Sequence, residues 1–516
     1  MRQLTSLDAQ FLALESARTY GHVSGLAILD PSTAPGGAIA GSDLCRLVSE
    51  RLALLKPFRW KLAEVPLGLD HPYWIEDPDF DLDFHIRETA APPPGDDRAL
   101  AEQVARIVAR PLDRSRPLWE LYLIHGLPEG RVAVLTKIHH AAVDGVSGAE
   151  ILSALVDLSP EGRDMPKDGR TARERSGERV PTQLEMLGRG LAGLPRQPIR
   201  ALGALPSAVP NLADVPGVQL VPGVGTIGRL STRARQALAN AEGEQLGGPS
   251  PITVPRTRFN HPISASRRFS FGSLPLDRVK AIKNELGISV NDVVVAICAT
   301  AMRNFLLERD ELPDDPLVAM VPVSVRTQEQ IGTFGNKIGV MIAPIPTNIA
   351  DPRKRLMAAH ETLRDAKTRH KAMPATLLQD VTKFIPPAVH ARASRATLRV
   401  MGSRRPPLNL VISNVPGPPM PLYMAGGRLE AHFPVSVIAD GVGLNITCMS
   451  YRDHIDFGIV VDREMVDDAW PLMEAHRAAL DEIDDVICGH RKGRVIPSEH
   501  GSRKPARTSQ AEPSHA

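Results

Sequence analysis

The sequence has few of the residues that mark several large classes of protein. Phe, Trp and Tyr make up only 4% of its 516 residues, which disfavours the aromatic platforms on which single-stranded nucleic acids stack. The formal net charge is only +2, whereas a nucleic-acid-binding domain is usually strongly basic. We therefore expect no nucleic-acid partner.

Cysteines and long apolar runs are also scarce. The four cysteines are scattered and form no CxxC pair, so we interpret them as reduced thiols of a cytosolic protein. No uncharged apolar run reaches about 18 residues, the length that a membrane-crossing helix needs, and the first residues lack the apolar core of a signal peptide. We expect a cytoplasmic protein, and if it handles lipid it must do so from a membrane surface.

The length and the 43% hydrophobic content are sufficient for more than one core. Strand and helix patterns alternate irregularly at both ends of the chain, which predicts two mixed α/β domains. Neither of these regions contains a GxGxxG motif or a P-loop, so nucleotide-cofactor folds are disfavoured. The predicted divisions are an N-terminal domain at 1–160, a linker with helical segments at 161–260, a C-terminal domain at 261–490 and a disordered tail at 491–516.

One segment combines clear structural signals with reactive side chains. An apolar, β-branched run at residues 131–138 predicts a short buried strand, and Ser147 with Glu150 has the form of a capping box that begins a helix. His139 and His140 lie between these two elements, on a strand-to-helix loop. Such loops carry many of the reacting side chains of α/β proteins.

Imidazole suits proton transfer near neutral pH, so one histidine of the pair is a candidate general base. Adjacent residues on an extended segment point to opposite faces, so we expect His139 and His140 to divide into one catalytic and one structural residue. Asp144 can hold a neighbouring element through an arginine, and Gly145 lets the chain turn closely. Two structural histidines remain an alternative. A metal site lacks a third strong ligand at a familiar spacing, so we expect no metal.

The segment from His139 to Gly145 matches the HHxxxDG motif of the CoA-dependent acyltransferase superfamily. Within it, the chain resembles the bacterial wax ester synthase/diacylglycerol acyltransferase family, and the resemblance covers most of residues 1–485. The supporting segments, in chain order, are Leu7-Asp8-Ala9-Gln10-Phe11, His71-Pro72-Tyr73-Trp74, Pro117-Leu118-Trp119-Glu120, Asn291-Asp292, Pro322-Val323-Ser324-Val325-Arg326 and Gly335-Asn336.

The resemblance implies both the architecture and the site. We expect two chloramphenicol acetyltransferase-like mixed-sheet α/β domains, with the active site in a channel between them. His140 is the expected general base, His139 and Asp144 complete the catalytic set, and Asp144 fixes the loop through Arg326. The residues expected to bind substrate are Asn291, Gly145, Trp119 and Arg326, with Asn291 also a candidate oxyanion donor.

Three of these side chains have simpler interpretations. Trp119 can be core packing at the start of a strand predicted at residues 119–124. Asn291 or Asp292 can be a cap of the apolar helix predicted at residues 292–307, and Arg326 can be a surface residue at the end of a strand. Their roles therefore stay open at this point.

The implied activity is acyl-CoA-dependent O-acyl transfer that makes triacylglycerol from diacylglycerol and fatty acyl-CoA, with acyl-CoA as a substrate and no cofactor. One alternative is a wax ester synthase that uses a long-chain fatty alcohol, and another is a non-catalytic lipid-surface protein. We expect peripheral association with a membrane or a lipid inclusion. The candidate contacts are apolar helical pieces at residues 184–194 and the arginines Arg392, Arg395 and Arg399.

Overall fold

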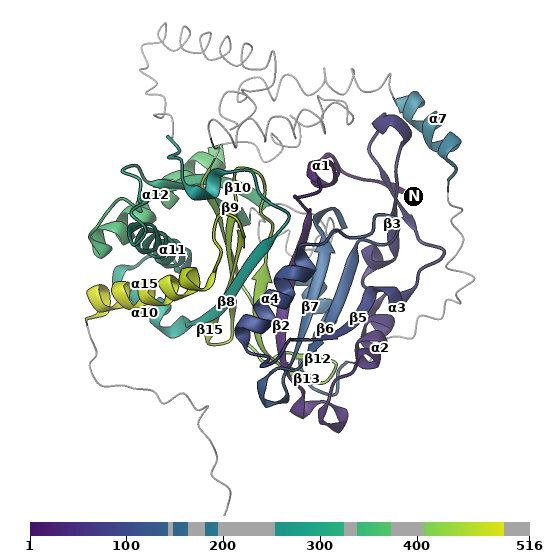
Figure 1. The fold of residues 1–516 in the computed structure, drawn as a ribbon, viewed down its shortest axis with the longest axis horizontal. Coiled ribbons are helices and arrows are strands. Elements are labelled where there is room, and N and C mark those ends of the chain that lie inside the picture. Colours follow the sequence, from purple (N-terminus) through teal and green to yellow (C-terminus); the bar gives the residue numbers. More distant parts are fainter. Residues whose placement is uncertain are drawn as a thin grey trace, which may run out of the picture.

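The computed structural model describes residues 1–142, 148–163, 181–193, 253–324, 338–372, 406 and 408–489. These residues form two six-stranded sheets and one three-stranded sheet (Figure 1). Several predicted features lie outside the described residues, namely Asp144, Gly145, Ser147, Arg326, the three arginines from Arg392 to Arg399, most of the linker and the tail.

The first large sheet has the strand order β12-β13-β2-β7-β6-β5. Only β5 and β6 are parallel, and the other neighbours are antiparallel, so the sheet is mixed. Its strands are β2 (His22–Asp30), β5 (Ile86–Ala90), β6 (Trp119–His125), β7 (Val132–His139), β12 (Tyr423–Met424) and β13 (Gly427–Val435).

Helices cover both faces of this sheet. Alternate residues of β6 and β7 point to opposite faces, and both sets are mostly apolar, so each strand is buried on its two sides. The helices are α1 (Ser6–Leu14), α2 (Gly41–Arg51), α3 (Leu82–His85), α4 (Asp97–Val108), α5 (Gly148–Leu155) and α7 (Gln183–Gly193). The small sheet of β1 (Arg2–Gln3), β3 (Trp60–Ala63) and β4 (Tyr73–Glu76) belongs to the same half.

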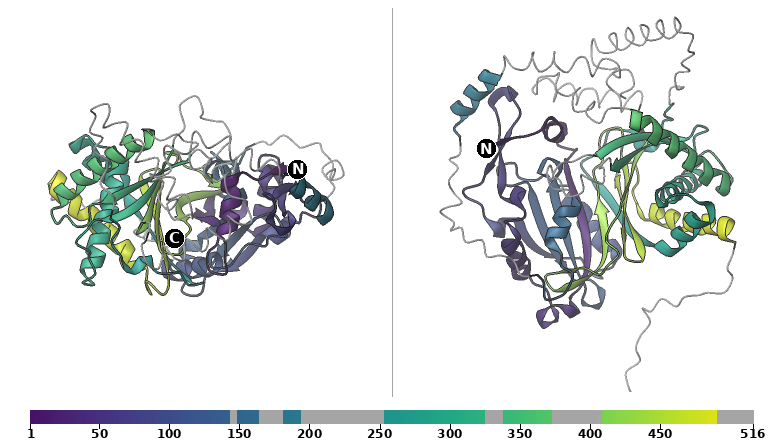
Figure 2. Two further views of the ribbon diagram at one scale, coloured as in Figure 1. Left: turned by 90° about the horizontal axis from the view of Figure 1, so that it is seen from above. Right: turned by 180° about the vertical axis from the view of Figure 1, so that it is seen from behind.

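The second large sheet has the order β10-β9-β11-β14-β15-β8, and β11 runs parallel to both of its neighbours. Its four helices lie on the side away from the first half (Figure 2). The strands are β8 (Arg267–Pro275), β9 (Leu317–Ser324), β10 (Ile338–Ile345), β11 (Leu410–Val415), β14 (Leu444–Tyr451) and β15 (His454–Asp462). The helices are α10 (Leu276–Leu286), α11 (Val290–Leu307), α12 (Pro352–Ala372) and α15 (Trp470–Cys488).

Helix α11 is the centre of the second core. Among the described residues it is the one helix long and apolar enough to cross a membrane, yet 72% of it is buried inside the protein, between the sheet and the other helices. Its N-cap is Ser289, whose side chain accepts the Asp292 amide while the Asp292 carboxylate accepts the Ser289 amide. The alternative in which Asn291 caps the helix is therefore wrong.

The mixed α/β fold class is confirmed, but two predicted strands are wrong. The alternation of apolar and polar residues at 80–86 predicts a strand, whereas residues 82–85 form α3. The side chain of Asp81 accepts the Asp83 amide at 3.1 Å and starts this turn, which competes with strand pairing. The apolar residues 435–438 also predict a strand, but only Val435 lies in one, as the last residue of β13, whose interior contains Glu430, His432 and Pro434.

The two halves are joined where β13 packs against β15. Strand β13 lies between β11 and β14 of the second half in sequence but pairs with β2 of the first sheet. The backbone amide of His432 on β13 donates to Asp456 Oδ2 on β15 at 2.8 Å. Two residues further on, Gly458 lies so close to Pro434 that an added Cβ atom would overlap the Pro434 carbonyl oxygen. A glycine at 458 is therefore required for this approach of the two sheets.

We predict that Gly458→Ala lowers the free energy of unfolding by about 1–3 kcal/mol, because the added methyl group must push β13 and β15 apart. Gly188→Ala is the matched control, since Gly188 lies in α7 with no atom within 4 Å of an added Cβ, and helix propensity favours alanine there. Thermal unfolding of both variants is the measurement. Equal stability of Gly458→Ala and the parent protein would show that the sheets tolerate the methyl group.

Candidate active site

Neighbouring strands hold the backbone of the two histidines on both sides. Strand β7 ends at His139, and His140 begins a 3-10 turn that extends to Ala142. The His139 amide donates to the Leu118 carbonyl at 3.0 Å, and the His140 amide donates to the Gly21 carbonyl at 2.8 Å. Both imidazoles are therefore placed by backbone bonds to the segments that precede β6 and β2.

His139 is buried, and only its Nδ1 makes a hydrogen bond among the described residues, while its Nε2 faces a carboxylate at ion-pair distance. Its Nδ1 accepts the backbone N–H of Ala141 at 3.0 Å, so this nitrogen carries no proton. Its Nε2 lies 3.1 Å from Glu15 Oε1. These contacts assign His139 the Nε2–H tautomer, and neither nitrogen is free to accept a proton from a substrate.

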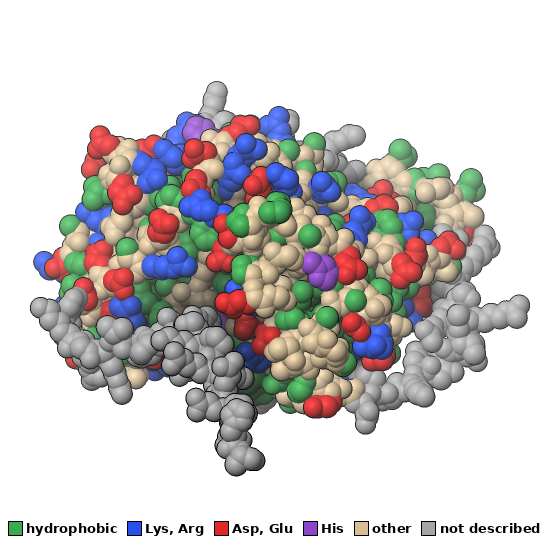
Figure 3. Space-filling view, turned by 60° about the horizontal axis from the view of Figure 1, so that its bottom comes forward, with side chains coloured by type: hydrophobic (Ala, Val, Ile, Leu, Met, Phe, Trp, Pro, Cys, Tyr) green, Lys and Arg blue, Asp and Glu red, His purple; other side chains and the backbone are tan. Residues whose placement is uncertain are grey.

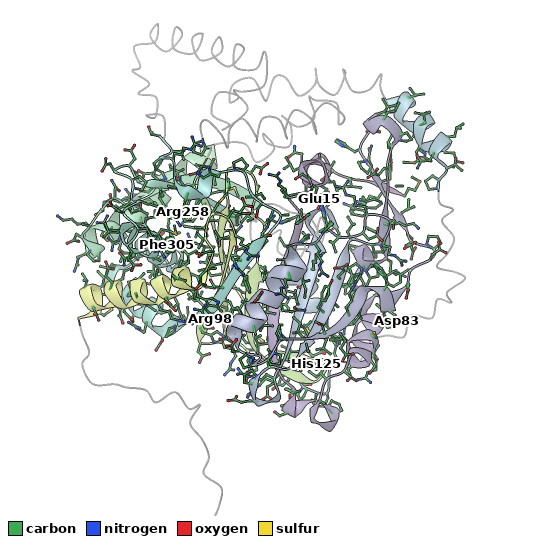
Figure 4. The ribbon with its side chains drawn as sticks, viewed as in Figure 1. Glu15, Asp83, Arg98, His125, Arg258 and Phe305 are labelled. Atoms are coloured by element: carbon green, nitrogen blue, oxygen red, sulfur yellow. The ribbon has the colours of Figure 1, made fainter. Side chains whose placement is uncertain are left out.

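Glu15 follows the last turn of α1, on the side of the first half that faces the second half (Figure 4). Its carboxylate also accepts the Gly21 amide at 2.8 Å and Arg114 Nη2 at 2.7 Å. Burial acts to raise the pKa of Glu15, but His139, Gly21 and Arg114 together outweigh burial and lower it to about 2. The group beside His139 is therefore a carboxylate.

His140 has different surroundings. Its ring stacks on Phe11 of α1, with 4.5 Å between the ring centroids and 11° between the planes. Burial, with a smaller contribution from the neighbouring His139, lowers the pKa of His140 to about 4. Within the described residues neither of its ring nitrogens has a hydrogen-bond partner. His140 is thus a neutral imidazole at physiological pH, able to accept a proton.

A buried ion pair lies along the same strand. Lys137 and Glu120 stand opposite each other on β7 and β6, with Nζ 3.2 Å from Oε2, and Tyr122 donates to the same carboxylate oxygen at 2.8 Å. Burial lowers the pKa of Lys137, and the pairing with Glu120 opposes that effect. This pair fixes the register of β6 against β7 two residues before the histidines.

The structure places the other predicted site residues in two regions. Trp119 is buried between Phe58 and His85, at centroid distances of 4.2 and 4.4 Å, and its Nε1 donates to the Phe58 carbonyl. This geometry favours the core-packing interpretation of Trp119. Asn291 lies in the first turn of α11, where its Oδ1 accepts Asn414 Nδ2 at 3.3 Å.

The N-terminus of α11 is held by a second interaction. Asp292 Oδ2 lies 2.9 Å from His360 Nδ1 on α12, in addition to its bond to the Ser289 amide. Among the described residues no group of three or more His, Cys, Asp or Glu side chains can hold a metal ion. The expected absence of a metal stays a prediction.

Sequence reasoning missed the residues that surround the histidines, namely Phe11, Glu15, Gly21 and Arg114. Phe11 belongs to the quoted Leu7–Phe11 segment, and Glu15 lies four residues further on, at the spacing that places two side chains on one face of a helix. This spacing was the signal available in the sequence. That these two side chains contact His140 and His139 was visible only in the structure.

Comparison with known proteins identifies the family. The wax ester synthase/diacylglycerol acyltransferase catalytic domain matches residues 4–294, and the C-terminal domain of the same family matches residues 334–484. The chain belongs to this family. It is therefore an acyltransferase, and the resemblance carried by the HHxxxDG segment and the supporting segments is confirmed.

The relatives match over nearly the whole chain. A Mycobacterium tuberculosis protein named as a diacylglycerol O-acyltransferase is 37% identical over 487 residues, which cover 94% of this chain and 90% of the relative. A second one, tgs2, is 33% identical over 490 residues, covering 93% of this chain and 98% of the relative.

Solved structures agree with the fold. The wax ester synthase/diacylglycerol acyltransferase of Marinobacter aquaeolei is 30% identical, with a TM-score of 0.65 over 95% of this chain and all of the other. The trichothecene 15-O-acetyltransferase of Fusarium sporotrichioides has a TM-score of 0.52 at 14% identity over 93% of this chain and 94% of the other, which shows a shared fold alone. The expected two-domain acyltransferase architecture is confirmed, and the channel stays a prediction.

We predict that Phe11→Ala moves the acid limb of the pH profile of kcat/KM upward. The phenyl ring shields one face of His140 from water, and its removal lets the pKa of His140 rise from about 4 toward the ordinary value of 6.5. A group with a lowered pKa stays neutral until the pH falls to that value, so the parent enzyme should keep its activity at about pH 5.5 while Phe11→Ala loses it.

The measurement is thiol release from palmitoyl-CoA between about pH 4.5 and pH 8. Phe305→Ala, in the core of the second half, controls for general loosening of the fold. Identical acid limbs in Phe11→Ala and the parent enzyme would contradict the prediction.

Proposed function

We propose that this acyltransferase moves a fatty acyl group from acyl-CoA to the hydroxyl group of diacylglycerol, with His140 as the general base. The observation that carries the proposal is the contrast within the pair. His139 accepts the Ala141 amide with Nδ1 and faces the Glu15 carboxylate with Nε2, whereas His140 is neutral and has no hydrogen-bond partner among the described residues.

In the proposed reaction, a ring nitrogen of His140 takes the hydroxyl proton as the acceptor oxygen attacks the thioester carbonyl carbon. A C–O bond forms, and the carbonyl electron pair moves to oxygen to give a tetrahedral oxyanion. When the carbonyl reforms, the C–S bond breaks and the CoA thiolate takes the proton from His140. The products are an ester and CoA, and no acyl-enzyme is formed.

The developing oxyanion needs a hydrogen-bond donor, and Asn291 supports that role. Because its Oδ1 already accepts the Asn414 amide, its own NH₂ group is oriented as a donor. The N-terminus of α11 adds a partial positive charge in the same place, since helix dipoles are positive at that end. Asp144 fixes the loop through Arg326 in this proposal, and both residues lie outside the described ones.

The acceptor alcohol separates two versions of the activity. The M. tuberculosis relatives carry the name diacylglycerol O-acyltransferase, which supports diacylglycerol, while the Marinobacter enzyme carries both activities in its name, which supports a long-chain alcohol as the alternative. A non-catalytic lipid-surface protein does not require a neutral imidazole that lacks a hydrogen-bond partner among the described residues. The surroundings of His140 therefore disfavour this alternative.

We predict that His140→Ala loses transfer by at least about 100-fold, the usual scale for a missing general base, while His139→Ala keeps measurable activity. Thiol release from palmitoyl-CoA is measured with dioleoylglycerol and with hexadecanol as acceptors, and circular dichroism shows that both variants fold. Folded His140→Ala with full activity would refute the assignment of the base. A preference for hexadecanol would favour wax ester synthesis.

We also propose peripheral association with a membrane or lipid-inclusion surface, because both lipid substrates are insoluble. Among the described residues, the candidate apolar site for lipid contact is one corner of the first half, where α7 packs on the turn of Pro66–Gly68 (Figure 1). Met186 is buried there, while Leu67 and Leu184 are 81% and 83% exposed. Leu67 also has a left-handed backbone with φ +61, an unfavourable conformation for leucine that holds its side chain outward.

The charged surface offers a weaker contact. On the face shown in Figure 3, Lys and Arg side chains are mixed with Asp and Glu side chains among the described residues. Mixed charges attract an anionic surface little, and salt screens them beyond about 10 Å at 0.1 M. The arginines at 392, 395 and 399 lie outside the described residues.

We predict that the protein floats with neutral vesicles and remains bound at high salt, and that the double variant Leu67→Ser/Leu184→Ser reduces the floating fraction. Leu307→Ser, an exposed leucine at the end of α11, is the matched control. Failure to float with any vesicle would refute surface association. Release by salt alone would assign the contact to charges instead of the leucines.

A further inference from the structure

The segment from Glu15 to Gly21, between α1 and β2, connects both halves of the molecule to the histidine turn. Arg114, which follows α4 in the first half, donates to the Leu12 carbonyl at 2.8 Å and to Glu15. Arg267 on β8 of the second half donates to the Arg18 carbonyl and lies 5.7 Å from the Tyr20 ring. One arginine from each half therefore holds this segment.

The two oxygens of Glu15 have separate partners. Oε1 faces the Gly21 amide at 2.8 Å and His139 Nε2 at 3.1 Å. Oε2 faces Arg114, with Nη2 at 2.7 Å and Nε at 3.2 Å. Every one of these partners is a donor, so the site requires an acceptor at both oxygen positions.

The contact with His139 continues into the turn that carries His140. His139 Nε2 lies 3.1 Å from Glu15 Oε1, and its Nδ1 accepts the amide of Ala141, the residue directly after His140. The ring fits only because residue 21 is glycine, since an added Cβ atom would lie 2.6 Å from His139 Nε2. The carboxylate, the ring and the turn thus form one chain of contacts.

We propose that Glu15 is a positioning residue, which holds His139 in its Nε2–H form and thereby orients the turn that presents His140 to the substrate. This inference rests on the proposed function, because positioning matters only if His140 is the general base. In this proposal His139 links Glu15 to the turn that carries His140, and His139 does not itself transfer a proton.

A neutral amide cannot replace the carboxylate. If the amide oxygen of Glu15→Gln faces Gly21 and His139, its NH₂ group faces the Arg114 guanidinium, and donor meets donor. In the opposite orientation the NH₂ group faces the Gly21 amide and His139 Nε2–H. Substitution of Arg114 removes the donor–donor contact of the first orientation. The loss of activity caused by Glu15→Gln should therefore be reversed by a second substitution at Arg114.

The test compares Glu15→Gln, Arg114→Gln and the double variant in the thiol-release assay with palmitoyl-CoA and dioleoylglycerol. We expect Glu15→Gln to lower kcat about 10–100-fold, the usual effect of removing a residue that orients a functional histidine, with KM for palmitoyl-CoA unchanged. The double variant should recover kcat relative to Glu15→Gln, because the introduced amide oxygen can then accept from His139.

Glu64→Gln is the matched control. Glu64 is exposed and lies 3.7 Å from the same Arg114 without contacting His139, so this variant should have the parent kcat. If Glu15→Gln does not fold, Gly21→Ala carries the test: it keeps every charge but displaces the His139 ring, and it should lower kcat likewise.

The outcomes separate this inference from the proposed function. Inactive His140→Ala together with fully active Glu15→Gln would overturn the positioning role and leave His140 as the base. A loss in Glu15→Gln that the double variant does not relieve would also overturn it, because the ion pair with Arg114 would then be what matters. Active His140→Ala would overturn the proposed function first.

Discussion

The hydrogen bond from the His140 amide to the Gly21 carbonyl, 2.8 Å long, ties the histidine turn to the segment between α1 and β2. The other features of the site depend on this link. The same segment brings Glu15 to His139, and α1 brings Phe11 to His140, so two adjacent imidazoles acquire opposite properties. A carboxylate with its pKa lowered to about 2 holds one ring, and an apolar ring covers the other. The two rings therefore differ in function: His139 Nδ1 already accepts the Ala141 amide, whereas His140 is neutral, has no hydrogen-bond partner among the described residues and can accept a proton.

The connection between the halves explains why a site on one sheet depends on the whole chain. Strand β13 comes late in the sequence and completes the first sheet, and its contact with β15 requires glycine at 458. Arg267 adds a second connection from β8 to the segment before β2. Movement of the second half would therefore reach Gly21, and through it the amide of His140. In acyl transfer between two bulky lipid substrates, the reacting atoms must be held within a few tenths of an ångström. The relative position of the two halves must therefore be fixed.

Much of the fold was predictable where one physical rule dominates. The buried strands β6 and β7 and helices such as α10 and α11 follow from hydrophobic runs and periodicity, and the HHxxxDG segment pointed directly to the family. The failures have local causes. The cap at Asp81 converted an alternating segment into a turn, and β13 contains a histidine whose ring fits because residue 25 on β2 is glycine. Glu15 could not be paired with His139 from sequence, because that contact depends on how α1 lies against the end of β7.

The protonation state of His139 tests the central claim most directly. Long-range ¹H–¹⁵N correlation spectra of protein labelled with ¹⁵N-histidine, with His139→Gln and His140→Gln used for assignment, report which ring nitrogen carries the proton. The account predicts that His139 Nδ1 carries no proton, because it accepts the Ala141 amide, and that the neighbouring His140 titrates at about pH 4. A His139 protonated on Nδ1, or a His140 that titrates at about 6.5, would contradict it.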